Sequence, residues 1–319
     1  MALFSETIPT ILKAIKSNLE ECIHGKPAEI NLLLTALLAK GHVLIEDVPG
    51  TGKTVFVKAL AKSIDGQFRR IQCNPDLLPT DVTGVSIYHP KEEQFVFRPG
   101  PLFTNLLLVD EINRATTKTQ SALLEAMEER VVTMDGEGHA LPDPFMMLAT
   151  QNPIDFEGTY SLPEAQLDRF MFKLSIGYPD QATEHQMIVS QEQSHPLDRL
   201  ESVADIQQVQ QMQEQVRLVH LDNSVATYIV DITRATREHA AVYLGASPRA
   251  TLALVNAAKA YALVNGRSFV LPDDVKYLAT YVLSHRILIH SGARMEGANV
   301  NSVIQSILEQ VRVPVRLEK

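Results

Sequence analysis

The stretch Asp47–Thr54 joins two glycines, a lysine and a threonine directly after an apolar run. Gly50 and Gly52 allow positive φ and close backbone approach, so successive N–H groups can converge on a phosphate at a helix N-terminus. Lys53 can then reach the β- and γ-phosphates of a nucleotide, and the Thr54 hydroxyl can bind Mg²⁺. The stretch therefore predicts a site for ATP with Mg²⁺.

This loop departs from the strict phosphate-loop pattern GxxxxGK[ST], because Asp47 stands where the pattern has glycine. The alternative is an ordinary strand-to-helix turn. The run Gly-Thr-Gly-Lys-Thr favours phosphate binding, since it has few structural uses directly after a buried strand. The predicted nucleotide contacts in the loop are Val48, Pro49, Gly50, Thr51, Gly52, Lys53, Thr54 and Val55.

A second apolar run, Leu106–Val109, ends in the carboxylates of Asp110 and Glu111. Ligands of parallel sheets bind beyond the carboxyl ends of the strands, so this pair is expected to face the phosphate loop. Asp110 suits Mg²⁺ binding, usually through water, and Glu111 suits polarisation of an attacking water. The alternative is a pair of solvated carboxylates in a turn.

A third apolar run, Phe145–Thr150, is followed by Gln151 and Asn152. The Asn152 amide could hydrogen-bond the γ-phosphate and orient the same water, which would distinguish ATP from ADP. Asn also suits a turn before proline, and that alternative stays open from the residues alone.

Five short apolar segments alternate with helical patterns up to residue 177, which predicts an α/β domain with a parallel sheet between helices. The expected strands are His42–Glu46, Phe68–Cys73, Leu106–Val109, Phe145–Thr150 and Phe170–Ile176. Two segments resemble hairpins, one within Thr80–Pro101 and one over Val131–Leu141 with Asp135-Gly136 at its turn. Helical periodicity dominates after Gly177, so we expect domains at 1–177 and 178–319, the second all-α.

Taken in order, the motifs resemble those of AAA+ ATPases, and among them the MoxR family. The resemblance extends over nearly the whole chain, and its most specific segments are Glu46–Thr54, Phe97–Phe103, Val109–Ala115, Ala149–Pro153, Leu162–Phe170 and Gly245–Arg249. It implies a five-stranded sheet in the order 5-1-4-3-2, a smaller helical lid and ATP hydrolysis. It also implies that the two hairpins are the family's insertions at the surface and pore of a ring.

The resemblance assigns roles to two arginines and to one turn. Arg169 resembles the arginine finger, which reaches the γ-phosphate bound by the adjacent subunit, and Arg249 resembles the lid arginine that contacts phosphate in its own subunit. Ile23, His24 and Gly25 would lie against adenine, although His24 departs from the commoner residues. From the residues alone, Arg169 could instead pair with Asp168 or Glu164, and Arg249 could be a surface charge.

The resemblance further implies a homo-oligomeric ring, most simply a hexamer, that acts as a chaperone-like remodeller. The expected partners are a protein with a von Willebrand factor A domain and a client complex, which ATP-driven movement of the lid would mature or activate.

The net charge of −9 disfavours general binding to a phosphate backbone. A nucleic-acid-dependent helicase is one alternative function, but the segment Val131–Leu141 contains no Lys or Arg. A non-catalytic nucleotide-gated scaffold is another, and intact Lys53, Glu111 and Arg169 disfavour it. We therefore expect no nucleic-acid partner.

Cys22 and Cys73 lack metal-site spacing and are expected to be buried thiols. His285 and His290 are expected on a helix surface or in packing. The apolar stretches are shorter than the roughly 20 residues that span a bilayer, and the first residues do not resemble an export signal. These features predict a cytoplasmic protein without membrane insertion.

Overall fold

A five-stranded parallel sheet forms the centre of the computed structural model, which describes residues 7–48, 50–91, 93–152, 159–191 and 196–314. Its strands, from edge to edge, are β2 (Phe68–Gln72), β5 (Leu106–Asp110), β8 (Met146–Gln151), β1 (Val43–Glu46) and β9 (Phe172–Leu174). Numbered within this sheet alone, the order is 2-3-4-1-5, which is 5-1-4-3-2 read from the other edge. The predicted sheet is confirmed, and its strand ends shift by one or two residues.

Helices cover both faces of this sheet, as the apolar strands require. The helices that precede β9 in the chain are α1 (Thr7–Cys22), α2 (Pro27–Leu38), α3 (Lys53–Ser63), α4 (Pro79–Thr83), the 3-10 helix η1 (Ile112–Arg114), α5 (Thr117–Glu129) and α6 (Glu164–Leu167). Alternate residues of β5 enter different clusters: Leu106 and Leu108 pack with α1, α2 and α3, while Leu107 and Val109 pack with α5. Phe56 of α3 is 1% exposed and lies inside the first cluster.

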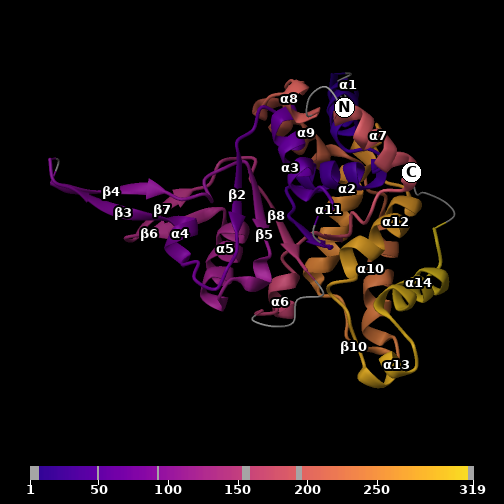
Figure 1. The fold of residues 1–319 in the computed structure, drawn as a ribbon. Helices are drawn as coiled ribbons and strands as arrows, with labels where there is room; N and C mark the ends of the chain where they lie inside the picture. Colours follow the sequence, from indigo (N-terminus) through magenta and orange to yellow (C-terminus); the bar gives the residue numbers. More distant parts are fainter. Residues whose placement is uncertain (1–6, 49, 92, 153–158, 192–195, 315–319) are drawn as a thin grey trace.

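Two antiparallel hairpins leave the sheet on the same side of the molecule (Figure 1). They are β3 (Gly84–His89) with β4 (Gln94–Pro99), and β6 (Val131–Met134) with β7 (Glu137–Ala140). Asp135 and Gly136 both have positive φ, 52° and 83°, as the tight turn was predicted to need. Phe97 stacks on His139 with ring centroids 4.2 Å apart, which joins the two hairpins.

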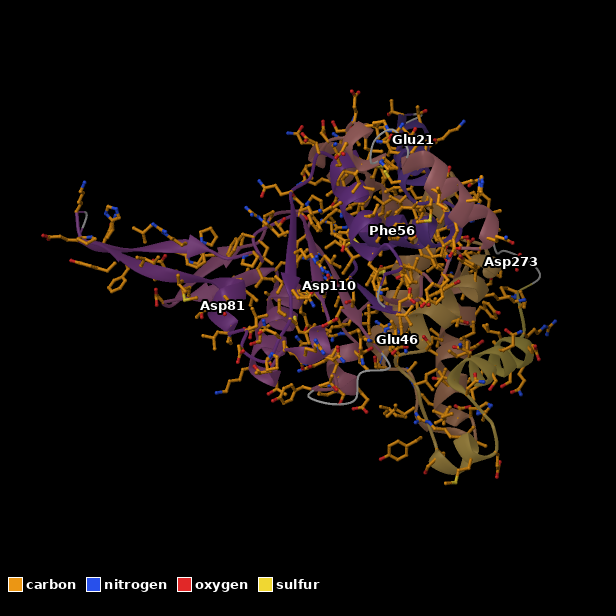
Figure 2. All side chains as sticks on the ribbon, viewed as in Figure 1. Glu21, Glu46, Phe56, Asp81, Asp110 and Asp273 are labelled. Carbon is orange, nitrogen blue, oxygen red and sulfur yellow. The ribbon has the colours of Figure 1, made fainter. Side chains whose placement is uncertain are left out.

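The β3–β4 hairpin projects furthest from the body, and its side chains extend into the surrounding space (Figure 2). Phe95 is 71% exposed and Tyr88 is 49% exposed, and the two rings pack edge to face at 5.4 Å. Both hairpins are therefore confirmed as elements of the fold.

The chain after β9 is mainly helical, as predicted. Its elements are α7 (Gln181–Gln191), α8 (Pro196–Arg199), α9 (Ile206–Leu218), α10 (Asn223–Glu238), α11 (Pro248–Val264), α12 (Pro272–Leu283), α13 (Ser291–Met295) and α14 (Val300–Gln310), with a short antiparallel pair of β10 (Val242–Leu244) and β11 (Leu288–Ile289). The β10–β11 pair is an addition to the expected all-α pattern. Over the described ranges, no helix has both the length and the apolar character needed to cross a bilayer.

The helical part after β9, expected to be the lid, packs closely on the part that contains the five-stranded sheet. One cluster of buried apolar residues runs from α1, α2 and α3 into α9, α10, α11 and α12. Because α11 lies against α2, the lid is attached to the N-terminal helices as well as to β9. The division at residues 177 and 178 stays a prediction, since the apolar core is continuous across it.

Candidate nucleotide site

The phosphate loop connects β1 to α3, as its sequence predicts. Gly50 and Gly52 have φ of 87° and 83°, and Gly52 is the N-cap of α3. A side chain at either position would be strained, so glycine is required by the backbone itself. The Lys53 ammonium donates to the Val48 carbonyl at 2.6 Å and to the Thr51 hydroxyl at 3.2 Å. The expected contact at Pro49 lies outside the described residues.

A cavity of about 210 Å³ lies over this loop. Its lining from the loop and α3 is Asp47, Gly50, Thr51, Gly52, Lys53, Thr54 and Val55, and from the sheet it is Arg70, Gln72, Asp110, Glu111, Thr150, Gln151 and Asn152. Partial burial lowers the pKa of Lys53, and the carboxylates of Asp47 and Asp110 oppose this shift. Apart from Val48 and Pro49, the structure thus brings the predicted loop and strand-end residues around one cavity.

Asp110 and Glu111 are held by a residue that the sequence did not single out. The Thr150 hydroxyl accepts a hydrogen bond from the Glu111 N–H at 2.9 Å and donates to the Asp110 carboxylate at 3.2 Å. Thr150 lies at the end of β8, beside β5 in the sheet. Thr150 therefore joins the Asp110 carboxylate to the backbone of Glu111 at the carboxyl edge of the sheet.

Arg70 is the second site residue that sequence reasoning missed. Its Nε donates to the Asp110 carboxylate at 2.6 Å, and its Nη2 donates to Gln72 at 3.1 Å. β2 pairs with β5 in parallel, with Gln72 opposite Asp110, and this register brings Arg70 to the cavity. The alternation in β2, with Arg70 and Gln72 on one face, was the signal available in the sequence.

Glu111 has an unusual backbone, with φ of 56° and ψ of 50°. Left-handed backbone at a residue with a side chain costs roughly 1–2 kcal/mol and is found where function requires a fixed direction. The Glu111 carboxylate forms an ion pair with Arg114 at 3.2 Å. The 3-10 helix η1 therefore holds the carboxylate at the cavity rim.

The residues present suit Mg²⁺ bound together with a nucleotide. The Thr54 hydroxyl and the Asp110 carboxylate line the same cavity, and Mg²⁺ typically takes one or two protein ligands beside water and phosphate oxygens. No group of three or more His, Cys, Asp or Glu side chains positioned to bind a metal is found within the described ranges. Mg²⁺ would thus take most of its ligands from water and phosphate.

Arg169 and Arg249 lie together in a different pocket. Its lining is Lys40, His42, Met127, Glu128, Arg130, Arg169 and Arg249. Arg169 contacts Glu128 at 3.1 Å and donates to the Leu124 carbonyl at 3.0 Å, and Arg249 forms an ion pair with the same Glu128. Arg169 therefore pairs with Glu128 in this structure, whereas Asp168 and Glu164 were the expected alternatives.

Arg249 lies outside the cavity at Lys53 in the single chain, and its contact with phosphate stays a prediction. Arg249 was expected to contact phosphate in its own subunit, but it lies beside Arg169 and outside the lining of the cavity at Lys53. The cause is the orientation of the lid, because α11 packs against α2 and directs its N-terminal turn toward Glu128 on α5.

The turn Ile23–Gly25 lies against the start of α7. A Cβ on Gly25 would approach the Thr183 hydroxyl to 2.6 Å, and Lys26 donates to the Tyr178 carbonyl at 3.3 Å. The His24 Nε2 atom is buried without a hydrogen-bond partner among the described residues. Ile23, His24 and Gly25 do not line the cavity at Lys53, so contact with adenine stays a prediction.

The environments of the two cysteines and of His285 differ in how deeply each side chain is buried. Cys73 is buried, and burial raises its pKa to about 12, whereas Cys22 is half-buried, which corrects the expectation of two buried thiols. His285 is buried, and burial lowers its pKa well below the usual value.

Comparison with known proteins decides the family. Residues 42–172 match the family described as "ATPase family associated with various cellular activities (AAA)", and residues 234–307 match the "AAA lid domain". Chaperone MoxR1 of Mycobacterium tuberculosis is 40% identical over 317 residues, which are 96% of this chain and 83% of that protein. The chain belongs to the MoxR family of AAA+ ATPases.

Other matches agree with this membership of the MoxR family. Uncharacterized protein YeaC of Bacillus subtilis is 51% identical over 316 residues, covering 99% of this chain and 98% of that protein. A crystal structure of a candidate ATPase from Cytophaga hutchinsonii superposes with a TM-score of 0.90 at 38% identity, covering 97% of this chain and 96% of the other. The fold and activity class expected from the motifs are those of a MoxR-family AAA+ ATPase.

Proposed function

We propose that this MoxR-family protein hydrolyses ATP to ADP and phosphate, with Mg²⁺, at the interface between two copies of the chain. The observation that carries the proposal is the division of the predicted site between two pockets. Lys53 and Glu111 line one pocket, and Arg169 and Arg249 line the other. A complete site therefore needs the first pocket of one subunit and the second pocket of its neighbour.

Each residue of the first pocket has a task in this reaction. Lys53 binds the β- and γ-phosphates, and Thr54 and Asp110 would hold Mg²⁺, which would supply charge neutralisation to the phosphates. The Glu111 carboxylate accepts a hydrogen bond from the attacking water, and the Asn152 amide orients that water against the γ-phosphate.

The arginines act on the nucleotide of the adjacent subunit. Both guanidinium groups share Glu128 in the single chain, and a γ-phosphate, like that carboxylate, offers them negatively charged acceptor oxygens that an arginine can bind in pairs. We propose that Arg169 and Arg249 leave Glu128 for the phosphate when subunits assemble. Their positive charge then stabilises the charge that develops on the transferred phosphoryl group.

The assembly is proposed to be a ring, most simply a hexamer, in the cytoplasm. Similarity to the relative named Chaperone MoxR1 supports a chaperone-like role. We propose that the ring works with a partner that has a von Willebrand factor A domain, and that movement of the lid during hydrolysis matures or activates a client complex.

Mixing two inactive variants tests the shared site. Lys53→Ala removes phosphate binding and Arg169→Ala removes the arginine finger, so each variant alone should lose ATPase activity. Random mixing in equal amounts places an intact Lys53 opposite an intact Arg169 at about a quarter of the interfaces. Activity that returns on mixing supports the proposal, and assembled mixed rings without activity would contradict it.

Affinity capture with Glu111→Gln tests the biological role, because this variant should bind ATP and hold its partners. Recovery of a von Willebrand factor A protein supports the remodeller. Enrichment of nucleic acid would favour a helicase, and unchanged turnover in Glu111→Gln would favour a non-catalytic scaffold.

A further inference from the structure

Arg286 lies directly after α12 in the lid, and its side chain is 2% exposed. A guanidinium has five N–H donors, and this one uses all five. Its acceptors are the Asp168 carboxylate at 2.7 Å and the carbonyls of Asp168 at 2.9 Å, Phe170 at 2.6 Å, Met171 at 3.2 Å and Val282. Four of the five bonds therefore go to the backbone and side chain of residues 168–171.

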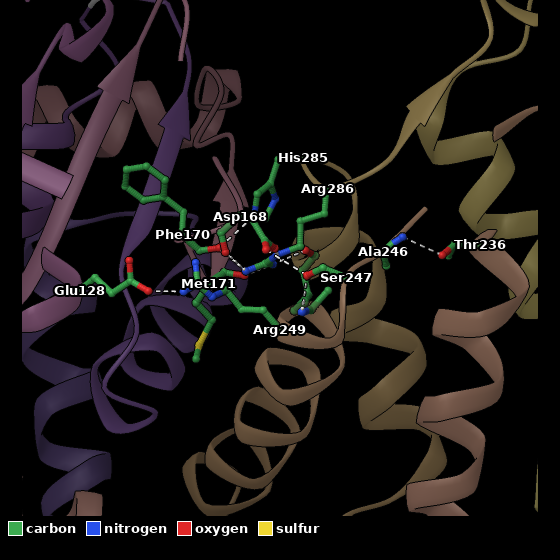
Figure 3. Close-up of polar contacts among 12 residues, drawn as sticks. Glu128, Asp168, Phe170, Met171, Thr236, Ala246, Ser247, Arg249, His285 and Arg286 are labelled. Carbon is green, nitrogen blue, oxygen red and sulfur yellow. Dashed lines mark hydrogen bonds and ion pairs between the residues drawn. The ribbon is translucent and has the colours of Figure 1, made fainter. Parts of the chain in front are cut away.

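Two further lid residues hold the same segment (Figure 3). The Ser247 hydroxyl, at the N-cap of α11, donates to the Asp168 carboxylate at 2.9 Å. The His285 Nε2 atom lies 2.9 Å from the Phe170 carbonyl. Residues on both sides of Arg169 are thus bound to the lid of their own subunit.

Arg169 itself makes none of these contacts and points the other way. Its guanidinium extends toward α5, where it contacts the Leu124 carbonyl and the Glu128 carboxylate. We call the contacts of Ser247, His285 and Arg286 with residues 168–171 the clamp. The clamp fixes the backbone that carries the Arg169 side chain, and it leaves the Arg169 guanidinium free to contact other groups.

We propose that Arg286 is a positioning residue for Arg169, so that ATP hydrolysis in one subunit depends on the lid of the neighbouring subunit. This inference rests on the proposed function, in which Arg169 serves the adjacent site. The hydrogen-bond partners of Arg286 do not include any residue that lines the cavity at Lys53, so its effect on its own nucleotide is indirect at most.

The physical reason is the geometric demand of phosphoryl transfer. A displacement of about 1 Å at a catalytic group can cost roughly 10²-fold in rate. Without these contacts to the lid, the segment that carries Arg169 would keep its bonds to α6, the bond from the Met171 N–H to the His42 carbonyl and the buried Phe170 side chain, but it would lose its restraint on the lid side. Because the clamp joins the two parts, movement of the lid would directly change the position of Arg169.

Arg286→Lys tests this role, because lysine keeps the charge but has three donors and lacks the planar fork. We expect kcat to fall at least about tenfold while KM for ATP changes less than about threefold, since only contacts made in the transition state are lost. Binding of a fluorescent ATP analogue should stay close to the wild-type value.

Mixing separates positioning from general damage to the lid. Arg286→Lys subunits keep Lys53, and Lys53→Ala subunits keep the clamp and Arg169, so mixing them should restore activity. Mixing Arg286→Lys with Arg169→Ala should restore none, because both lack a working finger. A purely structural lid defect would impair the subunit's own site, and neither mixture would recover.

Arg267→Lys is the matched control. Arg267 makes a bidentate pair with Asp274 inside the lid, at 2.7 and 2.6 Å, and does not contact residues 168–171. Its kcat should stay within about twofold of wild type, because no contact to the transition state changes. Asp168→Asn, which keeps the acceptor oxygen and removes the charge, supplies a second test if Arg286→Lys does not fold.

Unchanged kcat in Arg286→Lys, or in Asp168→Asn where it replaces that variant, would overturn the inference. It would also be overturned if Lys53→Ala with Arg169→Ala regained activity while Lys53→Ala with Arg286→Lys did not. Failure of the first mixture as well would instead contradict the shared site of the proposed function.

Discussion

The Asp47 carboxylate accepts a hydrogen bond from the Gly177 N–H at 2.9 Å. The same Oδ2 atom accepts from Ile176 at 3.0 Å, and Oδ1 accepts from Val48 at 2.9 Å. Asp47, the first residue of the phosphate loop, is therefore bound to the chain that leaves β9 for the lid. This contact explains why aspartate stands where the strict phosphate-loop pattern has glycine.

Asp47→Gly should restore the usual pattern and yet destabilise the protein. Asp47 is buried, and loss of its carboxylate leaves three N–H groups without their acceptor. We expect the free energy of unfolding to fall by about 2–4 kcal/mol in urea titrations. Glu46→Gln is the control: it removes only the partly exposed pair with Lys173 and should change stability by less than about 1 kcal/mol. Equal stability of Asp47→Gly and wild type would show that the three bonds contribute little.

Arg70→Gln should strengthen the interaction with Mg²⁺. The Arg70 guanidinium occupies one oxygen of Asp110 and adds positive charge beside the metal position. Its removal should lower the Mg²⁺ concentration for half-maximal ATPase activity by roughly threefold to tenfold. Magnesium titration at saturating ATP measures this value, and Arg69→Gln, one residue away on the opposite face of β2, is the control. A higher Mg²⁺ requirement would instead indicate that Arg70 helps to bind the nucleotide.

Glu111→Asn should separate stability from activity. Asn tolerates left-handed backbone better than glutamate, so the variant should unfold at the same or a higher urea concentration than wild type. Its shorter amide cannot accept the proton of water, so turnover should fall by about 10²–10⁴-fold. Phosphate release and urea unfolding on the same preparation check both parts. Retained turnover would remove Glu111 from the proposed mechanism.

His42 should make the protein less stable in mild acid. Burial, with Arg130 nearby, lowers the pKa of His42 to about 3, and its Nδ1 atom accepts a hydrogen bond from Met147. An unfolded His binds its proton near pH 6.5, so the unfolded state holds more protons between about pH 6.5 and 3. Stability is therefore full above pH 6.5 and falls as the pH is lowered through this window.

His42→Asn tests this dependence, because its side-chain oxygen can replace Nδ1 as the acceptor without titrating. Urea unfolding at pH 7.5 and 5.0 should show a smaller loss in the variant than in wild type, by up to about 2 kcal/mol. His285, whose pKa is also lowered by burial, keeps its own contribution in both proteins. Equal losses would exclude His42 as the cause.

The sequence predicted the fold and most of the first pocket because those features are local. Strands such as β5 are recognised by an apolar run, Leu106–Val109, that is buried on both faces, and Asp135-Gly136 is sufficient to predict its turn. Gly50, Gly52 and Lys53 act within one short segment, so their spacing was sufficient. The prediction that Cys22 is buried was wrong, because the exposure of a residue at the end of a helix depends on the segments packed beside it.

The missed features all depend on contacts between distant segments. Arg70 contacts Asp110, 40 residues later in the chain, because β2 and β5 pair side by side in the sheet. Arg249 lies beside Arg169 because of how the lid packs on α2, and no local pattern contains that orientation. Arg286 is an ordinary arginine in the sequence, and only the folded chain brings it to residues 168–171.

Lys53 and Arg169 line different pockets of the folded subunit, and this separation has a consequence for how ATP hydrolysis would be switched off. With the proposed shared site, a dissociated copy would lack a complete site, so dilution alone would stop hydrolysis without an inhibitor. In the proposed assembly, an open row of copies would leave one lysine pocket and one arginine pocket unused at its two ends, and only closure of the row would bring every copy into use.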